Sequence, residues 1–530
     1  MRRGTNVLVA LSLVGSAVPC LSTEPASTIH ACAHKNSGDL RVVEEPADCR
    51  PSEVPMSWSV EGPPGPPGQP GTVPNDDVAR LADLAGDPEF ADGLPRGLVQ
   101  PLDCLGVLEV TGLGDAPIPV VGMIGADGIS RIPRYRIVVE APPAPTWLGS
   151  PVEVRFTGDQ SSATFGGIVT EVAEVGSAAG GPLAAVELAP IAARLGLDRG
   201  FQVIQGASIP DLLDDMMNRV GQPFERLLSA SYEPLDMVVQ YRETDLDFLN
   251  RLLEEAGVFY YFRSDGRLVA TDFNDGLDRG AGSITFGDGA HGRRLTSFRS
   301  GDRLAASAAT VIGFDFETTV APVVATAPPG GGHPELAFFR PSVDSPGGAA
   351  SAARIELERA RAASGFATGS STAADLRAGR VVTIDVGTGL DGSYIVTGVR
   401  HVFVRDSNGC LLYGNAFNAT PDARAYRPPR VTPQPRITGP ESAIVVGRDP
   451  LGVPEDEFGR VKVKFHWDRA GGDSDTSAWI RVAHPAGRTD AAPAYVPDVG
   501  DEVLVLFAHG DVRFPYVVGS LYNAVDTPPE

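Results

Sequence analysis

Short runs of apolar and β-branched residues, each interrupted within a few positions by glycine or proline, fill most of the chain after Leu105. The 61 glycines and 46 prolines are about a fifth of the 530 residues, against roughly 12% in average usage, and they follow no chain-wide period. Since both residues mark turns, this spacing favours many short strands. We therefore predict a mainly β chain of several domains, in which 105–200 forms a barrel or sandwich.

Two stretches have the hydrophobic period of helices instead. A helix is predicted over 208–220, where Asp211 stands at the capping-box position of Ser208. A second helix is predicted over 244–256 by the same kind of box and by apolar residues at helical spacing. An Ala-, Arg- and Glu-rich segment predicts a third helix over 349–363.

Strand-like runs return after the third helix. The runs 381–384, 394–399 and 402–404 predict a second barrel-like domain, with His401 at the barrel rim. The Gly- and Pro-rich stretches within 325–349, which include Pro346-Gly347-Gly348, are predicted to be surface loops.

The segment 459–468 alternates strictly between apolar and polar residues. The apolar face holds Val461, Val463, Phe465 and Trp467, and the polar face holds Lys462, Lys464, His466 and Asp468. This alternation predicts a strand with one face in the core and the other in water. With the strand-like runs that follow, the last hundred residues predict a small five-stranded barrel of the oligonucleotide/oligosaccharide-binding (OB) type.

The N-terminus has the order of a secretory signal over 1–19. Arg2 and Arg3 precede an apolar run that ends at Val14 and is followed by small residues. The run is too short to span a membrane and no longer one follows, so no stable membrane insertion is predicted. An uncleaved segment or a misassigned start is the alternative, and the proline before Cys20 argues against a lipid anchor.

Three of the five cysteines lie in the first fifty residues. In an exported module they would form a disulfide, for which Cys32 and Cys49 are the candidates. Zinc ligation by these cysteines and the histidines near them is the competing interpretation, although the spacing fits no standard finger. Cys104 and Cys410 are isolated and are predicted to be small buried hydrophobes.

A strict Gly-X-Y run over 62–71 begins a spacer that extends to residue 104. Only glycine fits the axis of a collagen triple helix, but a run this short cannot hold one alone. We predict a stiff, extended linker, with a seam between three chains as the alternative if the body trimerises.

The charge balance and the motifs restrict the function. With 44 Lys and Arg against 67 Asp and Glu, the formal charge is −23, which repels phosphate backbones and excludes nucleic acid as a partner. His466, His484 and His509 lack metal-ligand spacing, so surface histidines are predicted and no metal site. No nucleophile elbow, Walker loop or dinucleotide fingerprint stands in a suitable context, so we expect no enzyme and no cofactor.

Two ordered motif sets resemble one known family. The segment 241–257 is similar to the signature of VgrG spike proteins of type VI secretion and of late-control hub proteins (protein D) of contractile phage tails, and 458–523 resembles the family's barrel. The residues that carry the resemblance are Tyr241, Arg242, Glu243, Asp247, Phe248, Leu252, Gly257, Gly459, Arg460, Val461, Phe465, Trp467, Asp468, Trp479, Arg481, Gly500, Glu502, Gly510, Asp511, Gly519, Tyr522 and Asn523. All are expected to have structural roles.

The resemblance implies two hub-type β-barrel domains braced by helices, followed by a C-terminal OB-fold-like barrel. It also implies a homotrimer, whose six barrels would match a hexameric tube protein to a threefold spike, with baseplate subunits and a separate spike-tip protein or effector as further partners. The expected parts are a signal-like segment 1–19, a small Cys-containing module 20–61, a collagen-like spacer and linker 62–104, a hub region 105–430 with barrels 105–200 and 295–425 around a helical part 201–262, and the OB-fold-like barrel 431–530.

The predicted function is that of a structural spike/hub of a contractile injection apparatus. Secretion-type members of the family assemble in the cytoplasm without a signal, so this chain is expected to be exported or extracellular if its signal is real, and otherwise to assemble in the cytoplasm before ejection. An exported, surface-displayed trimeric carbohydrate- or protein-binding protein with a collagen-like stalk is the first alternative, and a cell-wall hydrolase carried on a spike is the second.

Overall fold

The computed structural model describes most of the chain after residue 105 and short segments before it. The described residues are 28–34, 40–43, 53–59, 81–82, 90, 98, 100–103 and 106–529, with gaps at 159–161, 179–180, 281, 287–292, 318–320, 388, 406–408, 447–455, 457, 470–476 and 485–495. The predicted signal, the Gly-X-Y run and the side chains of Cys32 and Cys49 lie outside the described part.

The chain divides into two compact units, residues 1–70 and 71–530. In the first unit, β1 (Thr28–His34) lies between β2 (Leu40–Val43) and β3 (Glu53–Ser59) in an antiparallel sheet. The backbone of Cys32 lies on the central strand, so the Cys-containing segment forms a small three-stranded sheet.

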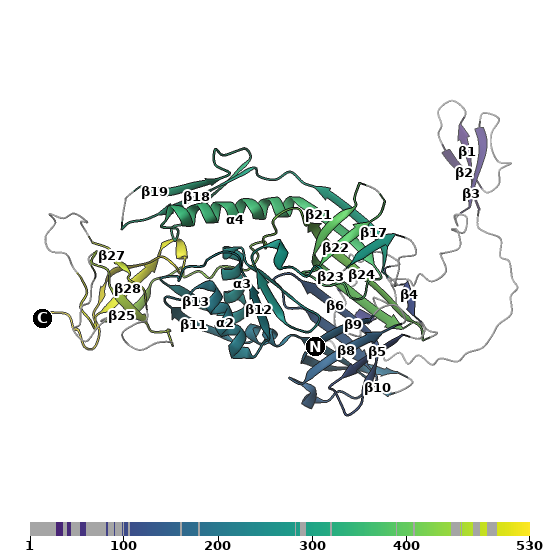
Figure 1. Cartoon of the computed structure of the whole chain (residues 1–530), viewed down its shortest axis with the longest axis horizontal. Helices are drawn as coiled ribbons and strands as arrows, with labels where there is room; N and C mark the ends of the chain where they lie inside the picture. Colours follow the sequence, from purple (N-terminus) through teal and green to yellow (C-terminus); the bar gives the residue numbers. More distant parts are fainter. Residues whose placement is uncertain are drawn as a thin grey trace. The chain divides into compact units, whose positions relative to one another are not determined.

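In the second unit, a thirteen-stranded sheet closes on itself twice (Figure 1). The first barrel consists, in sheet order, of β6 (Ile118–Gly128), β5 (Val107–Thr111), β8 (Pro151–Thr157), β9 (Ser162–Ala178), β10 (Gly181–Ala189) and β7 (Arg134–Val139), and β7 pairs back to β6. The second barrel consists of β24 (Leu411–Pro421), β21 (Gly365–Ser371), β17 (Arg294–Asp302), β16 (Ser283–Phe286), β22 (Val381–Asp385) and β23 (Gly392–Arg405), and β23 pairs back to β24. The antiparallel pairing of β23 with β6 joins the two barrels through the main chain. The predicted fold class is confirmed.

Aromatic side chains fill the junction between the barrels. Phe156 and Phe165 of the first barrel and Phe403 and Tyr413 of the second belong to one buried cluster. The ring of Phe403 lies 5.4 Å from Phe156, 5.9 Å from Phe165 and 4.3 Å from Tyr413, measured between centroids. Since such contacts add to the burial of apolar area, the two barrels share one continuous core.

His401 lies inside this core, so the prediction that it stands at a barrel rim is wrong. Its side chain is fully buried on β23, its Nδ1 lies 2.8 Å from the Tyr413 hydroxyl, and its Nε2 lies 3.5 Å from Arg377. Burial, and then the Arg377 charge, hold the pKa of His401 well below its ordinary value, so the ring is neutral. The sequence runs suggest two strands where β23 is continuous, and this continuity places His401 in mid-strand.

Asp127, at the same junction, is expected to favour the folded protein as the pH falls. Burial raises the pKa of its carboxyl from 3.8 to about 6, although Arg377 and the N–H of Ala378, 3.1 Å away, oppose the rise. A carboxyl with a raised folded-state pKa contributes stability that is complete below the unfolded value and is lost as the pH rises through about 6. The shift corresponds to about 3 kcal/mol in the free energy of unfolding.

Denaturant unfolding between pH 4 and pH 7.5 measures this contribution. Asp127→Asn should reduce the pH dependence of the free energy of unfolding relative to the wild type over that window. Asp115→Asn is the control, because the Asp115 side chain is exposed. Equal pH dependence in the wild type and in Asp127→Asn would contradict the assignment.

The helices at 208–220 and 244–256 are confirmed as α2 (Ile209–Val220) and α3 (Asp245–Ala256). Ser208 and Asp211 form the predicted capping box, and the Thr244 side chain accepts a hydrogen bond from the Asp247 N–H. With α2 and α3, a helical module over 199–271 contains β11 (Arg199–Ile204), β12 (Phe224–Leu227), β13 (Val238–Thr244), β14 (Phe259–Phe262) and β15 (Leu268–Thr271). The aromatic residues of β14 are buried, as expected for core.

The stretch predicted to be loops contains regular structure. Pro346-Gly347-Gly348 is the first turn of α4 (Pro346–Ser364), so the loop prediction is wrong there. Ser345 caps this turn by accepting from the Gly348 N–H, and proline suits a first helical turn, which explains how the helix begins in spite of two glycines. This helix contacts a sheet in the order β19 (Pro322–Ala327), β18 (Ala308–Phe314), β20 (Glu335–Phe339).

Cys410 is disulfide-bonded, so the prediction that it is an isolated buried hydrophobe is wrong. It directly precedes β24, whose Leu411 pairs with Asp103 of β4 (Gln100–Asp103). This pairing joins segments far apart in the chain, and cysteine spacing alone does not reveal it.

Loss of the Cys410 disulfide is expected to lower the free energy of unfolding by about 2–4 kcal/mol. Denaturant titrations of the wild type with and without reductant, and of Cys410→Ser, measure the effect. Peptide mapping without reductant identifies the partner cysteine. Equal stability of the wild type and Cys410→Ser under oxidising conditions would contradict the prediction.

The last hundred residues form the predicted small barrel. Its sheet has the order β26 (Lys462–Phe465), β25 (Glu441–Val446), β28 (Glu502–Phe507), β29 (Pro515–Leu521), β27 (Arg481–Val482). A bridge between Val461 and Ile480 connects the two outer strands, which closes the ring. We call this element the C-terminal barrel.

Candidate functional site: the joint between the helical module and the C-terminal barrel

The polar face of 459–468 meets the helical module. Lys462 and Asp468 are each only 6% exposed. The Asp468 carboxylate accepts the N–H of Val203 on β11 at 3.3 Å, and Lys462 Nζ donates to the Gln205 side chain at 3.1 Å. The prediction that this face lies in water is therefore wrong for these two residues, because β11 and Gln205, which follows it, supply partners that the alternation itself cannot indicate.

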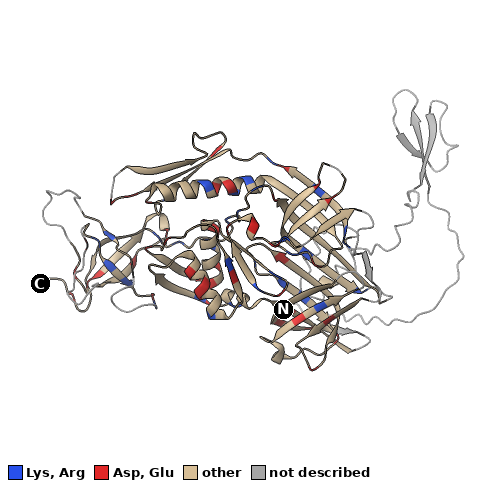
Figure 2. Ribbon diagram, viewed as in Figure 1, with Lys and Arg blue, Asp and Glu red and all other residues tan. Residues whose placement is uncertain are grey.

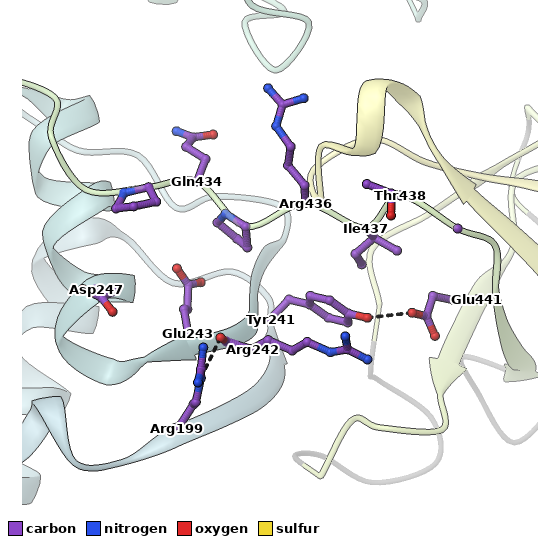
Figure 3. A pocket seen from close by; sticks show the side chains of 13 residues that line it. Arg199, Tyr241, Arg242, Glu243, Asp247, Gln434, Arg436, Ile437, Thr438 and Glu441 are labelled. Atoms are coloured by element: carbon purple, nitrogen blue, oxygen red, sulfur yellow. Dashed lines mark hydrogen bonds between the residues drawn. The ribbon is translucent and has the colours of Figure 1, made fainter. Parts of the chain in front are cut away.

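Tyr241 and Trp467, one from each motif set, meet in an aromatic cluster. Their ring centroids are 5.5 Å apart, Phe201 lies 5.4 Å from Tyr241, and Phe465 stacks on Trp467 at 4.7 Å. The Tyr241 hydroxyl donates to Glu441 at 2.8 Å, as the dashed line in Figure 3 shows. Burial, and then the bond to Glu441, raise the pKa of Tyr241, so its hydroxyl remains a donor at neutral pH.

Arg513 makes a second connection between the two parts. Its guanidinium donates to Glu255 of α3 at 2.7 Å and to Asp511 at 2.7 and 3.0 Å. Although burial raises the pKa of the Glu255 carboxyl, Arg513, Arg430 and Arg340 together hold it below its ordinary value. This ion pair is therefore charged at neutral pH and is partly shielded from solvent.

A buried ion pair fixes β13 to α3 behind the aromatic cluster. Arg251 is 3% exposed and donates to both carboxylate oxygens of Glu243, at 2.9 and 2.7 Å, and to the Val239 carbonyl at 2.7 Å. Burial raises the pKa of Glu243 more than Arg251 lowers it. Each of the two buried charges is therefore stabilised only while the other stays within hydrogen-bond distance.

The segment that leads into the C-terminal barrel is held against α3. The Glu254 carboxylate accepts the N–H groups of Val431 and Thr432, at 3.0 and 3.1 Å, and the Thr432 hydroxyl at 2.7 Å. Arg427 donates to the Gly257 carbonyl at 3.0 Å. Residues 427–432 of this connection are therefore hydrogen-bonded to the helical module and to α4, although the prolines of the segment predict only a domain boundary.

The other motif residues shape each half separately. On α3, Asp247 belongs to the N-terminal cap, Phe248 and Leu252 are buried, and Gly257 ends the helix. In the C-terminal barrel, Gly459, Gly500 and Gly510 adopt positive φ, Val461 is buried, Gly519 lies on β29 and Tyr522 is exposed. The remaining residues make side-chain contacts: Arg460 with Glu317 and Asp456, Trp479 with Lys462, Arg481 and Phe465 with aromatic rings, Asp511 with Arg513, and Asn523 with Glu502. The structure thus brings Tyr241, Phe465, Trp467, Asp468 and Asp511 to the joint and leaves the others within β13 and α3 or within the C-terminal barrel.

Sequence reasoning missed the residues that complete the joint. Phe201 and Val203 alternate on β11, and this short alternation is the only signal for them. Glu255 and Glu441 are single charges whose partners, Arg513 and Tyr241, lie 258 and 200 positions away in the chain, so no spacing indicates these contacts.

A pocket of about 490 Å³ opens beside the joint (Figure 3). β11, β13, α3 and the segment 433–441 line it, with Arg199, Arg242 and Arg436 among its residues. Within the described part of the chain, no group of three or more His, Cys, Asp or Glu side chains could hold a metal ion. In the same residues, no helix is both long and apolar enough to cross a membrane.

The fold and the joint define a class of proteins, baseplate hubs that carry an OB barrel. Residues 127–407 match the profile of the phage tail baseplate hub (GPD), and residues 444–522 match that of the type VI secretion system/phage-baseplate injector OB domain. The first match covers more than half of the chain. The chain belongs to the family of phage tail baseplate hub and VgrG spike proteins.

Individual relatives agree with this assignment. The spike proteins VgrG1c and VgrG1a of Pseudomonas aeruginosa are 27% and 28% identical to this chain, and each alignment covers 79% of it. The chain spans 61% and 69% of the length of these relatives. A solved Escherichia coli protein, c3393, described as a type VI secretion component with structural similarity to T4 tail proteins gp27 and gp5, shares the fold with a TM-score of 0.58 at 21% identity, over 78% of this chain and 99% of that one.

Proposed function

We propose that the chain is a structural spike/hub of a contractile injection apparatus, in which three copies connect a hexameric tube to a narrower tip. The observation that carries this proposal is the pair of closed barrels in one chain, each of six strands and joined to the other through β6 and β23. Three copies supply six barrels, and a ring of six similar barrels matches the symmetry of a hexameric tube.

The joint gives this hub its mechanical role. Force applied to the barrels passes to the C-terminal barrel through the aromatic cluster, the Arg513–Glu255 ion pair and the segment bound by Glu254. Because these contacts involve both β13 and α3, the C-terminal barrel is attached to the helical module at more than one point. We assign no reaction to the chain; baseplate subunits and a separate tip protein or effector are its proposed partners.

Export of the chain is proposed from the Cys410 disulfide together with the signal-like N-terminus. Disulfides persist mainly in oxidising compartments. Cell fractionation and intact mass of the native protein test export, since a processed signal shortens the chain. Recovery of the full-length, fully reduced protein from the cytoplasm would contradict export and leave the hub function standing.

The hub function is tested by the mass of the native assembly and by its binding to the tube protein. Light scattering should give three times the chain mass of 55.5 kDa, and the assembly should sediment with the hexameric tube protein. A single copy at every concentration, without affinity for the tube, would contradict the proposal. A trimer that binds carbohydrate and ignores the tube would favour the surface-displayed alternative.

A further inference from the structure

Arg242 occupies a backbone position that favours glycine. In the pairing of β11 with β13, Gly200 lies opposite Glu243 and Phe201 lies opposite Tyr241, so Arg242 is the extra residue of a β-bulge. Its φ is 54°, in the left-handed region. Glycine is the usual residue in such a bulge, because a Cβ disfavours this conformation. Backbone strain of this kind concentrates at functional sites.

Among the residues that the structure describes, no carboxylate pairs with the Arg242 guanidinium. This guanidinium lies 5.2 Å from the centre of the Tyr241 ring. Arg199 and Arg436 border the same pocket, and in the described part of the chain they donate to backbone carbonyls, those of Arg242 at 2.9 Å and His509 at 3.4 Å. None of these three arginines forms an ion pair with any residue that the structure describes.

The acidic side chains that line the pocket already have partners. Glu441 accepts from Tyr241, Glu243 is bound by Arg251, and Asp247 belongs to the N-terminal cap of α3. Figure 3 shows Arg199 and Arg242 on one side of the pocket and Arg436 on the segment across from them. Three arginines and three acidic residues line the pocket, and Arg251 neutralises Glu243, so the lining together with Arg251 has a formal charge of +1, in a chain whose net charge is −23.

We propose that this pocket binds an acidic segment of a second copy of this chain, whose carboxylates pair with Arg199, Arg242 and Arg436. Guanidinium groups bind carboxylates through paired, charge-assisted hydrogen bonds, so the chemistry fits Asp and Glu side chains. The volume of about 490 Å³ accommodates a short stretch of extended peptide. This role would account for an arginine at a position where glycine causes less strain.

Charge complementarity points to a second copy as the occupant. With 67 acidic against 44 basic residues, another copy offers many carboxylates, and Figure 2 shows Asp and Glu positions on many elements. Two such acidic chains repel each other, and a positive pocket at the contact reduces the repulsion and fixes the register of the copies. This inference rests on the proposed function, which brings three copies together.

Arg242→Gly separates binding from folding. The substitution should leave the melting temperature of the chain unchanged or raise it by about 2–4 °C, because it relieves the left-handed strain. The concentration at which half of the assembly dissociates should nevertheless rise at least tenfold. Analytical ultracentrifugation at 50 and 500 mM NaCl should show a salt-dependent assembly for the wild type and a weaker dependence for the variant. A tri-glutamate peptide should compete with assembly of the wild type, and inorganic phosphate at the same concentration should compete less.

Ser130→Gly is the matched control. Ser130 is also a non-glycine residue at positive φ, with a value of 56°, and it lies outside the pocket lining. The Ser130→Gly variant should have a higher melting temperature than the wild type and should assemble equally well. If the wild type forms trimers and Arg242→Gly forms them equally well, the pocket assignment is overturned and the hub function stands. If the wild type never associates, the result contradicts both the pocket assignment and the hub function. A lowered melting temperature in Arg242→Gly would overturn the strain argument.

Discussion

Trp467→Ala is expected to lower the free energy of unfolding by about 3–5 kcal/mol and to free the C-terminal barrel from the helical module. The indole packs at once on Phe465 within that barrel, at 4.7 Å, and on Tyr241 of the helical module, at 5.5 Å. Its removal therefore opens a cavity that neither side can fill alone. Denaturant unfolding measures the loss, and limited proteolysis should show faster cleavage within 427–436.

Trp467→Phe is the control for this prediction. The indole N–H is buried and has no hydrogen-bond partner, so phenylalanine removes no polar contact. The variant should keep most of the aromatic packing and lose about 1 kcal/mol. Protease resistance in Trp467→Ala equal to that of the wild type would show that the aromatic cluster does not hold the joint.

Arg251→Ala is expected to destabilise the protein by a similar amount, about 3–5 kcal/mol at neutral pH. The change leaves the Glu243 carboxylate, 8% exposed, without its cation, and it frees the Val239 carbonyl. Burial already raises the pKa of Glu243, and loss of Arg251 raises it further. Protonation of Glu243 then removes the unpaired charge, so the loss should shrink as the pH falls towards 5. Chemical denaturation at pH 5 and pH 7.5 measures both values.

Two comparisons make the Arg251 prediction specific. The double variant Glu243→Leu/Arg251→Met removes both charges and should be more stable than Arg251→Ala alone. Arg354→Ala removes an exposed partner of Glu358 on α4, at 3.0 Å, and should cost less than about 1 kcal/mol. Equal losses in Arg251→Ala and Arg354→Ala would contradict the assignment of Arg251 and Glu243 as a buried ion pair that stabilises the fold.

The helices and the barrel class were predictable because their signals are local. The Ser208–Asp211 and Thr244–Asp247 boxes act within one turn, and the alternation over 459–468 needs only neighbouring residues. A glycine directly after each helix indicates where the helix ends. Because these signals depend only on neighbouring residues, they can be recognised without knowing the rest of the fold.

The joint was not predictable, because its partners come together only in the folded chain. Lys462 and Asp468 look like solvent-facing residues until β11 lies beside them, and His401 looks like a rim residue until β23 runs through it. Cys410 gives no spacing signal either. Each of these errors concerns a polar or reactive side chain whose surroundings are set by residues distant in sequence.

The main-chain union of β6 with β23 has a consequence for how far such proteins can diverge. Almost every amino acid has a backbone amide and a carbonyl, so this main-chain pairing tolerates substitutions that would remove a contact between side chains. Side chains on the outward surface can then change while the pairing of the two barrels is kept, and a solved protein with 21% identity to this chain shares its fold.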